Sequence, residues 1–80
     1  MGSRTKNNDI YEIVSKNVRK YRIESNMTQE ELAEKANYSH QFIRKIEAPN
    51  IKKTYSLDAI FRISKALNRK FSDMFVEDER

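Results

Sequence analysis

The chain contains no cysteine and no tryptophan, and only one glycine, one proline and one histidine among its 80 residues. The lack of cysteine excludes disulfide bonds and thiolate metal sites. A single histidine cannot form a two-histidine metal motif, and the single glycine, Gly2, leaves no phosphate-cradling loop. The acidic pairs Glu30-Glu31 and Asp78-Glu79 suit helix capping and a solvated tail better than acid–base catalysis. We therefore expect no metal, no cofactor and no enzymatic activity.

Long hydrophobic runs are also missing. No apolar run approaches the ~18 residues of a membrane span, and no signal peptide is present. This pattern predicts a cytoplasmic protein, nucleoid-associated in a bacterial or phage setting, with no membrane partner and no small-molecule ligand. A chain of this length can form one domain with one small core. Such a core stabilises the folded state by only roughly 3–5 kcal/mol, so reinforcement by a partner subunit is expected.

Three segments differ in composition. Residues 1–8 lack apolar periodicity and are predicted to form a disordered arm, residues 9–76 the folded domain, and residues 77–80 an acidic tail. The formal net charge is +4, and because the tail carries −2, residues 1–75 carry +6 from 15 basic and 9 acidic side chains. A basic body suits a polyanion, although ordinary solubility accounts for the charge equally well.

A first helix is predicted over residues 10–25, where Asp9 followed by Glu12 provides the start signal. Apolar residues recur at helical spacing and should face the core, namely Ile10, Val14, Val18 and Tyr21. Cationic side chains occupy the remaining surface near its end and complement the helix dipole, namely Lys16, Arg19, Lys20 and Arg22. Asn26 then provides the stop.

The stretch Thr28–Glu47 contains two short helical patterns separated by a turn. Thr28 and Glu31 can form a capping box, and Ser39 repeats the start signal for the second helix. Asn37 stands where the chain reverses and tolerates the left-handed conformation. The inward positions are Leu32, Ala33, Ala36, Phe42, Ile43 and Ile46. The small Ala33 allows two helices to approach closely, so this stretch is predicted to be a helix-turn-helix.

A fourth helix is predicted from Ser56, after Pro49 ends the preceding one. One of its faces carries Leu57, Ile60, Phe61, Ser64 and Leu67, with Ile63 beside them. Asn68 can take the left-handed stop, and residues 71–75 are predicted to form a short fifth helical turn. The pattern therefore indicates a compact all-α unit of five helices, with the helix-turn-helix at the second and third.

This stretch resembles the helix-turn-helix of the phage-repressor and Cro family, also called the XRE family. The matching residues are Gln29, Ala33, Ser39, Ile43, Ile46 and Glu47, with Asn37 in place of the family's turn glycine. The similarity extends from about Val14 to Phe75. It implies a lambda-repressor-like DNA-binding domain, and a transcriptional regulator, more often a repressor, that binds a double-stranded DNA operator.

The outward stripe of the second helix of this motif carries no carboxylate. With Phe42, Ile43 and Ile46 inward, this stripe consists of Gln41, Arg44, Lys45 and Ala48 at i, i+3, i+4 and i+7. Gln can bond adenine and Arg guanine in bidentate fashion, and a major groove admits such a helix. Gln41 and then Arg44 are the first candidates for base contacts; Ser39, His40 and Lys45 are candidates for base or phosphate contacts. The alternative is a solvated helix face.

The resemblance implies phosphate contact by Gln29, at a helix start where free N–H groups already favour an anion. Further phosphate candidates lie on segments that flank the reading helix, namely Lys35, Asn37, Asn50, Lys52 and Lys53. The family's pairing of a glutamate with an arginine implies an Arg22–Glu47 bridge. Part of the Arg22 guanidinium would then remain available to a phosphate.

The C-terminal apolar residues Phe71, Met74, Phe75 and Val76 exceed what one short turn can bury, so some should form a homodimer contact; the alternative is a monomer core. Family dimers place two reading helices in successive major grooves, roughly 34–36 Å apart, on an inverted repeat.

Family domains also occur as antitoxins, restriction–modification controller proteins and coactivators, so action through a protein partner is the alternative function. RNA binding is disfavoured because A-form grooves do not admit such a helix.

Overall fold

The structure is a computed structural model that describes residues 9–49 and 53–77. Within these ranges it contains four α-helices and one 3₁₀ helix, and no strand: α2 (Ile10–Glu24), α3 (Gln29–Ala36), α4 (His40–Glu47), α5 (Leu57–Ala66) and η1 (Phe71–Phe75). The all-α prediction is confirmed, but the expected fifth helix is a 3₁₀ turn. The predicted arm, Asn50, Lys52 and residues 78–80 of the predicted tail lie outside the described residues.

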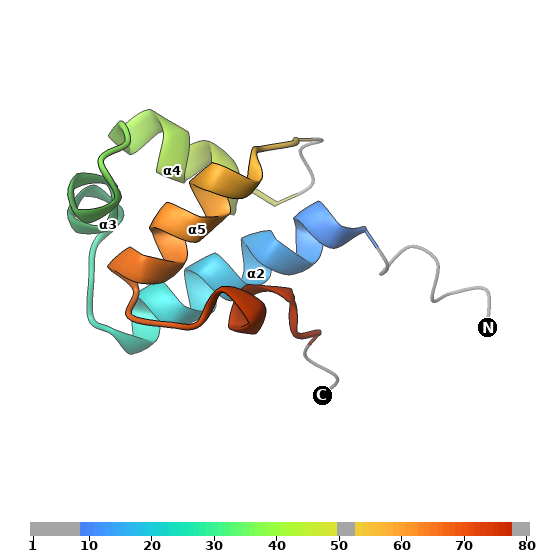
Figure 1. The fold of residues 1–80 in the computed structure, drawn as a ribbon. Coiled ribbons are helices and arrows are strands. Elements are labelled where there is room, and N and C mark those ends of the chain that lie inside the picture. The colour runs from blue at the N-terminus through green and yellow to red at the C-terminus, as the bar shows by residue number, and fades with distance from the viewer. Residues whose placement is uncertain (1–8, 50–52, 78–80) are drawn as a thin grey trace.

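The helices pack around one another in a single body (Figure 1). α3 packs against α4 and α5, while η1 packs against both α2 and α5. α2 also contacts α4 and α5. None of these helices is long and apolar enough to cross a membrane. The reading helix of the predicted motif, α4, is thus held on one side by α3 and on another by α2.

Local hydrogen bonds define the helix-turn-helix as predicted. The Thr28 hydroxyl accepts from the Glu31 N–H at 3.0 Å, and the Glu31 carboxylate accepts from the Thr28 N–H at 2.8 Å. The Ser39 hydroxyl accepts from the Phe42 N–H at 3.1 Å. Asn37 closes α3 in the left-handed conformation, with φ 63°. These contacts confirm the capping box, the second cap and the turn.

The core joins residues from every helix. The most deeply buried large side chains are Leu32, Ile43, Ile46, Ile63, Met74, Val14 and Val18. Met74 was predicted to lie in a dimer contact, and that prediction is wrong, because Met74 is completely buried within the monomer. Asn17 of α2 explains how η1 is held there, since its side-chain amide donates to the carbonyls of Met74 at 2.7 Å and Val76 at 2.9 Å.

Three apolar residues predicted to face the core are exposed instead. Ile10 lies in the first turn of α2, and Leu57 and Phe61 of α5 are 68% and 48% exposed. The side of α5 that packs inward carries Ala59, Ile60, Ile63, Ser64 and Leu67. The apolar face of α5 is therefore broader than the surface that α2, α3 and η1 can cover.

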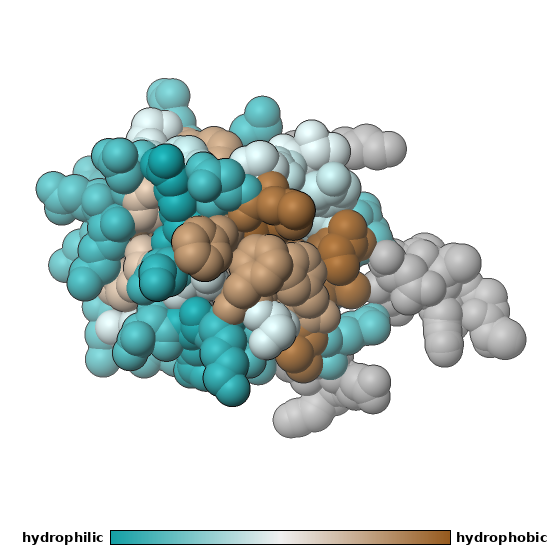
Figure 2. All heavy atoms as spheres, viewed as in Figure 1, coloured by the Kyte–Doolittle hydropathy of each residue, from teal (hydrophilic) through white to brown (hydrophobic). Residues whose placement is uncertain are grey.

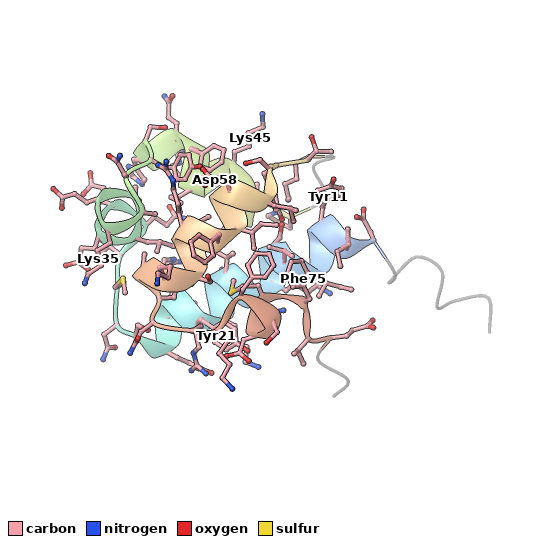
Figure 3. All side chains as sticks on the ribbon, viewed as in Figure 1. Tyr11, Tyr21, Lys35, Lys45, Asp58 and Phe75 are labelled. Carbon is pink, nitrogen blue, oxygen red and sulfur yellow. The ribbon has the colours of Figure 1, made fainter. Side chains whose placement is uncertain are left out.

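Exposed apolar residues gather over α5 and η1, and we call Leu57, Phe61, Phe71 and Val76 the α5–η1 patch. Figure 2 shows a hydrophobic area in the centre of this face. Edge-on aromatic contacts run across it, with ring centroids 6.2 Å apart for Phe61 and Phe71 and 5.1 Å apart for Phe71 and Phe75. Phe75, the last residue of η1, is half-buried against the core and lies on the side of η1 that faces α5 (Figure 3).

Candidate nucleic-acid interface

An open groove lies along α4, and we call it the α4 groove. Its lining comes from α2, α3, α4 and the residues after α4, namely Arg19, Gln29, Gln41, Arg44, Lys45, Glu47, Ala48 and Pro49. The fold therefore brings the first candidates for base contact, Gln41 and Arg44, to the same surface as Gln29 from the start of α3. Lys45, expected beside them, also lines this groove.

The side chains of α4 that line the groove are available to a ligand. Gln41, Arg44 and Lys45 are all exposed, and Lys45 extends from α4 away from the body of the protein (Figure 3). Within the described residues, the ion pairs are Arg22–Glu47, His40–Glu30, Arg62–Asp58 and Arg69–Glu24. Arg44 and Lys45 are absent from these pairs, so their charge is open to an anion.

Glu47 is the one carboxylate in the groove lining, and Arg22 compensates its charge. Arg22 Nε donates to Glu47 Oε2 at 2.7 Å and Nη2 donates to Oε1 at 2.9 Å, while Nη1 donates to the Met27 carbonyl at 2.8 Å. The hydrogen bond with Glu47 raises the pKa of Arg22, burial opposes this, and the charge of Glu47 adds to it. The predicted pair is thus present as a two-pronged ion pair.

Gln29 joins this network from α3. Its side-chain amide Nε2 donates to Glu47 Oε1 at 3.1 Å. Glu47 therefore connects three helices, with Arg22 on α2, Gln29 on α3 and its own backbone on α4. Charge-assisted hydrogen bonds of this kind are strong when partly buried, so the network holds α4 at a defined orientation to its neighbours.

Two predicted contact residues lie at the start of α4 and do not line the α4 groove. The Ser39 hydroxyl is engaged as the helix cap. His40 Nδ1 lies 3.7 Å from a carboxylate oxygen of Glu30, and its side chain is 41% exposed. Both remain near the end of the helix that recognition helices usually insert first.

The predicted phosphate candidates beyond Gln29 are dispersed. Lys35 and Asn37 line a different groove, which they share with α5 residues Phe61, Arg62 and Lys65. Lys53, another candidate for phosphate contact, does not point freely into solvent. It is buried, and its ammonium group donates to the Ala48 carbonyl at the end of α4. A cation at a helix C-terminus is favoured by the helix dipole, which accounts for this position.

Arg19 lines the α4 groove although the sequence pattern pointed only to a role in complementing the dipole of α2. Its distance of three residues from Arg22 places the two side chains on neighbouring positions of one helix face. That spacing was the available signal, but the packing of α2 against α4 decides that Arg19 meets the groove.

Together the capped helix-turn-helix, the all-α body and the basic α4 groove define a helix-turn-helix DNA-binding domain. A family model described as helix-turn-helix matches residues 18–74. The chain belongs to this family, the XRE-type helix-turn-helix, whose members are DNA-binding regulators.

The fold is also that of a solved structure, the crystal structure of a hypothetical transcription factor, NHTF, from Neisseria. The two share a TM-score of 0.80 and 20% sequence identity over 88% of this chain and 78% of that chain. At this identity the likeness concerns the fold. No curated protein matches the sequence.

Proposed function

We propose that the protein is a sequence-specific transcriptional repressor that inserts α4 into the major groove of double-stranded DNA as a homodimer on an inverted repeat. One observation carries the DNA-reading part of this proposal. Gln41, Arg44 and Lys45 are exposed along a groove whose only carboxylate, within the described residues, is compensated by Arg22. The described lining of the α4 groove therefore presents no uncompensated negative charge to a duplex.

The spacing of the reading side chains suits base contacts. Gln41 and Arg44 are three residues apart, which corresponds to about 4.5 Å along a helix axis. Successive base pairs are about 3.4 Å apart, so the two side chains can reach neighbouring pairs. Gln favours adenine and Arg favours guanine in bidentate contacts. Gln29, Lys35, Asn37, Ser39 and His40 remain candidates for contacts to the flanking phosphates.

Selection of bound sequences from a pool of random duplexes tests the reading role. The parent chain should return one preferred half-site, and Gln41→Ala and Arg44→Ala should each lose about 1–3 kcal/mol of discrimination at one base-pair position. Lys20→Ala, an exposed change on α2 away from the groove, is the matched control. Equal loss of affinity on every sequence for both variants would reduce these residues to phosphate contacts.

The α5–η1 patch supports the homodimer. Its residues come from two elements that pack together, and they form a contiguous apolar surface rather than isolated side chains. Patches of this kind mark interaction sites on small proteins. A two-fold contact through one patch is self-complementary, and it would present two α4 helices to one duplex.

Sedimentation equilibrium tests the dimer. Leu57→Ser removes the most exposed side chain of the patch without opening the core. It should therefore raise the dissociation constant of the dimer at least tenfold. Ile23→Ser, an equally apolar exposed position on α2, is the control and should leave the dimer intact. A monomeric parent at the highest concentrations reached would refute the homodimer.

Repression requires only that the bound dimer occupy DNA needed by polymerase. In a reporter whose promoter overlaps the selected site, the parent chain should lower expression, while Arg44→Ala should not. Raised expression with the parent would make the protein an activator while leaving its DNA reading intact.

A further inference from the structure

A second open groove continues the α4 groove along α2, and we call it the α2 groove. It is lined by Glu12, Ser15, Lys16, Arg19, Glu47 and Pro49. Three of these residues, Arg19, Glu47 and Pro49, also line the α4 groove. The two grooves therefore meet at Arg19 and form one concave strip that runs from α4 to the first turn of α2.

The α2 side of this strip is a regular helix face. Glu12, Ser15, Lys16 and Arg19 stand at i, i+3, i+4 and i+7, which places them in one row. Lys16 and Arg19 are exposed. Among the described residues, neither side chain takes part in the ion pairs, side-chain hydrogen bonds or cation–π contacts that the structure contains.

Several cations elsewhere on the surface are compensated. Arg62 pairs with Asp58 and lies over the Tyr38 ring, and Arg69 pairs with Glu24. On α2 itself, the neighbouring Lys20 lies over the Tyr21 ring at 5.4 Å. Lys16 and Arg19, by contrast, bring positive charge without an internal partner to the strip.

The junction of the two grooves does not repel an anion. Glu47 lies there, but it is buried and bonded to both Arg22 and Gln29. The strip is consequently cationic from Lys45 on α4 to Lys16 on α2. It ends at Glu12, an acidic residue in the first turn of α2.

We propose that Lys16 and Arg19 bind adjacent phosphates of the duplex that α4 reads, which extends the DNA contact onto α2. The inference rests on the proposed function. The two residues are about 4.5 Å apart along the helix axis, comparable with the 3.4 Å of duplex axis per phosphate on one strand. Such contacts position the protein and add affinity without reading sequence. We call this pair of contacts the phosphate track. Glu12 sets its outer limit by repelling the next phosphate.

Salt-dependent binding to two duplexes tests the track, one carrying the selected half-sites and one of random sequence. Lys16→Gln and Arg19→Gln each remove one phosphate contact per subunit and two per homodimer, so each should reduce the magnitude of the slope of log K against log[salt] by about 1.8. Between 50 and 200 mM salt, this change corresponds to about a 12-fold difference from the parent. Both duplexes should be affected by the same factor, and the double variant should lose about twice the slope of either single variant.

Lys20→Gln is the matched control, because it removes the same charge from the same helix outside both grooves. It should keep the parent's slope. Glu12→Gln should bind both duplexes more tightly, with the gain fading as salt rises. Unchanged melting temperatures by circular dichroism should accompany Lys16→Gln and Arg19→Gln, since both side chains are exposed.

The outcomes separate this inference from the proposed function. If Arg44→Ala weakens binding while Lys16→Gln and Arg19→Gln match Lys20→Gln, the duplex does not reach α2 and the phosphate track is wrong. The DNA-reading role of α4 stands in that case. If the parent chain binds neither duplex, the proposed function and the track both fail.

Discussion

Replacement of Arg22 by methionine should destabilise the domain by about 3–5 kcal/mol, because it leaves the Glu47 carboxylate buried without its ionic partner. The Glu47 side chain is 3% exposed and that of Arg22 is 13% exposed. This loss is comparable with the roughly 3–5 kcal/mol that a single small core supplies. Since 1 kcal/mol corresponds to about 4–8 °C in domains this small, the melting temperature should fall by at least about 12 °C.

Two further variants isolate the ion pair from simple loss of packing. Arg22→Met combined with Glu47→Leu removes both charges, and apolar replacement of a buried pair is often close to neutral, so most of the stability should return. Arg22→Lys keeps the charge but cannot reproduce the two-pronged geometry, and it should cost about 1–2 kcal/mol. In the double variant, Gln29 has lost its Glu47 acceptor, so DNA binding should stay weak although folding recovers.

Thermal and urea unfolding followed by circular dichroism would measure the four proteins of the double-mutant cycle, which Glu47→Leu completes, together with Arg22→Lys. A coupling free energy of about 2 kcal/mol or more is expected between the two positions. If Arg22→Met melts within about 2 °C of the parent, or if the two single effects simply add, the pair does not hold α4 against α2. Recovery of DNA binding in the double variant would show that Gln29 needs no acceptor at Glu47.

Three other predictions follow from single positions. Asn37→Ala should cost about 1–2 kcal/mol because φ is 63° there, while Asn37→Gly should be nearly neutral; equal melting of the two variants would contradict this. Met74→Ala should cost about 2–5 kcal/mol in urea unfolding at any protein concentration, whereas a concentration-dependent cost would return Met74 to the dimer contact. Burial raises the pKa of Tyr55 to about 12, so the neutral phenol is favoured by folding; this stability is present below about pH 10 and is lost as the pH rises from 10 to 12. Tyr55→Phe should be less stable than the parent at pH 8, because it loses the hydrogen bond to the Tyr11 carbonyl. Above pH 10 the parent should lose about 1 kcal/mol more stability than Tyr55→Phe, after allowance for solvent screening. Parallel declines of the two proteins would refute the raised pKa.

Helix ends were predictable because their signals are local. The Thr28–Glu31 capping box and the Ser39 cap are hydrogen bonds between residues three apart in sequence. Likewise, Asn26, Asn37 and Asn68 all adopt positive φ, as an asparagine at a chain reversal suggests. Neighbouring residues alone determine such features, so no knowledge of the fold was needed.

The interior was less predictable where a helix offers more apolar surface than the fold can cover. In α5, Leu57 and Phe61 belong to the same broad apolar face as Ile60 and Ile63, but only the latter two are buried. Lys53 is the converse case, since a lysine in a polar loop turns inward to the end of α4. Both outcomes depend on how helices distant in sequence pack together.

The helices, the helix-turn-helix and the outward polar stripe of α4 follow from local sequence, because capping and periodicity act over a few residues. Three other features depend on the packing of the helices: Gln29 and Arg19 share a groove with that stripe, Met74 fills the monomer core, and Leu57 and Phe61 remain exposed. These features require particular helices to cross at particular places, and such crossings arise from side-chain packing between segments far apart in the chain.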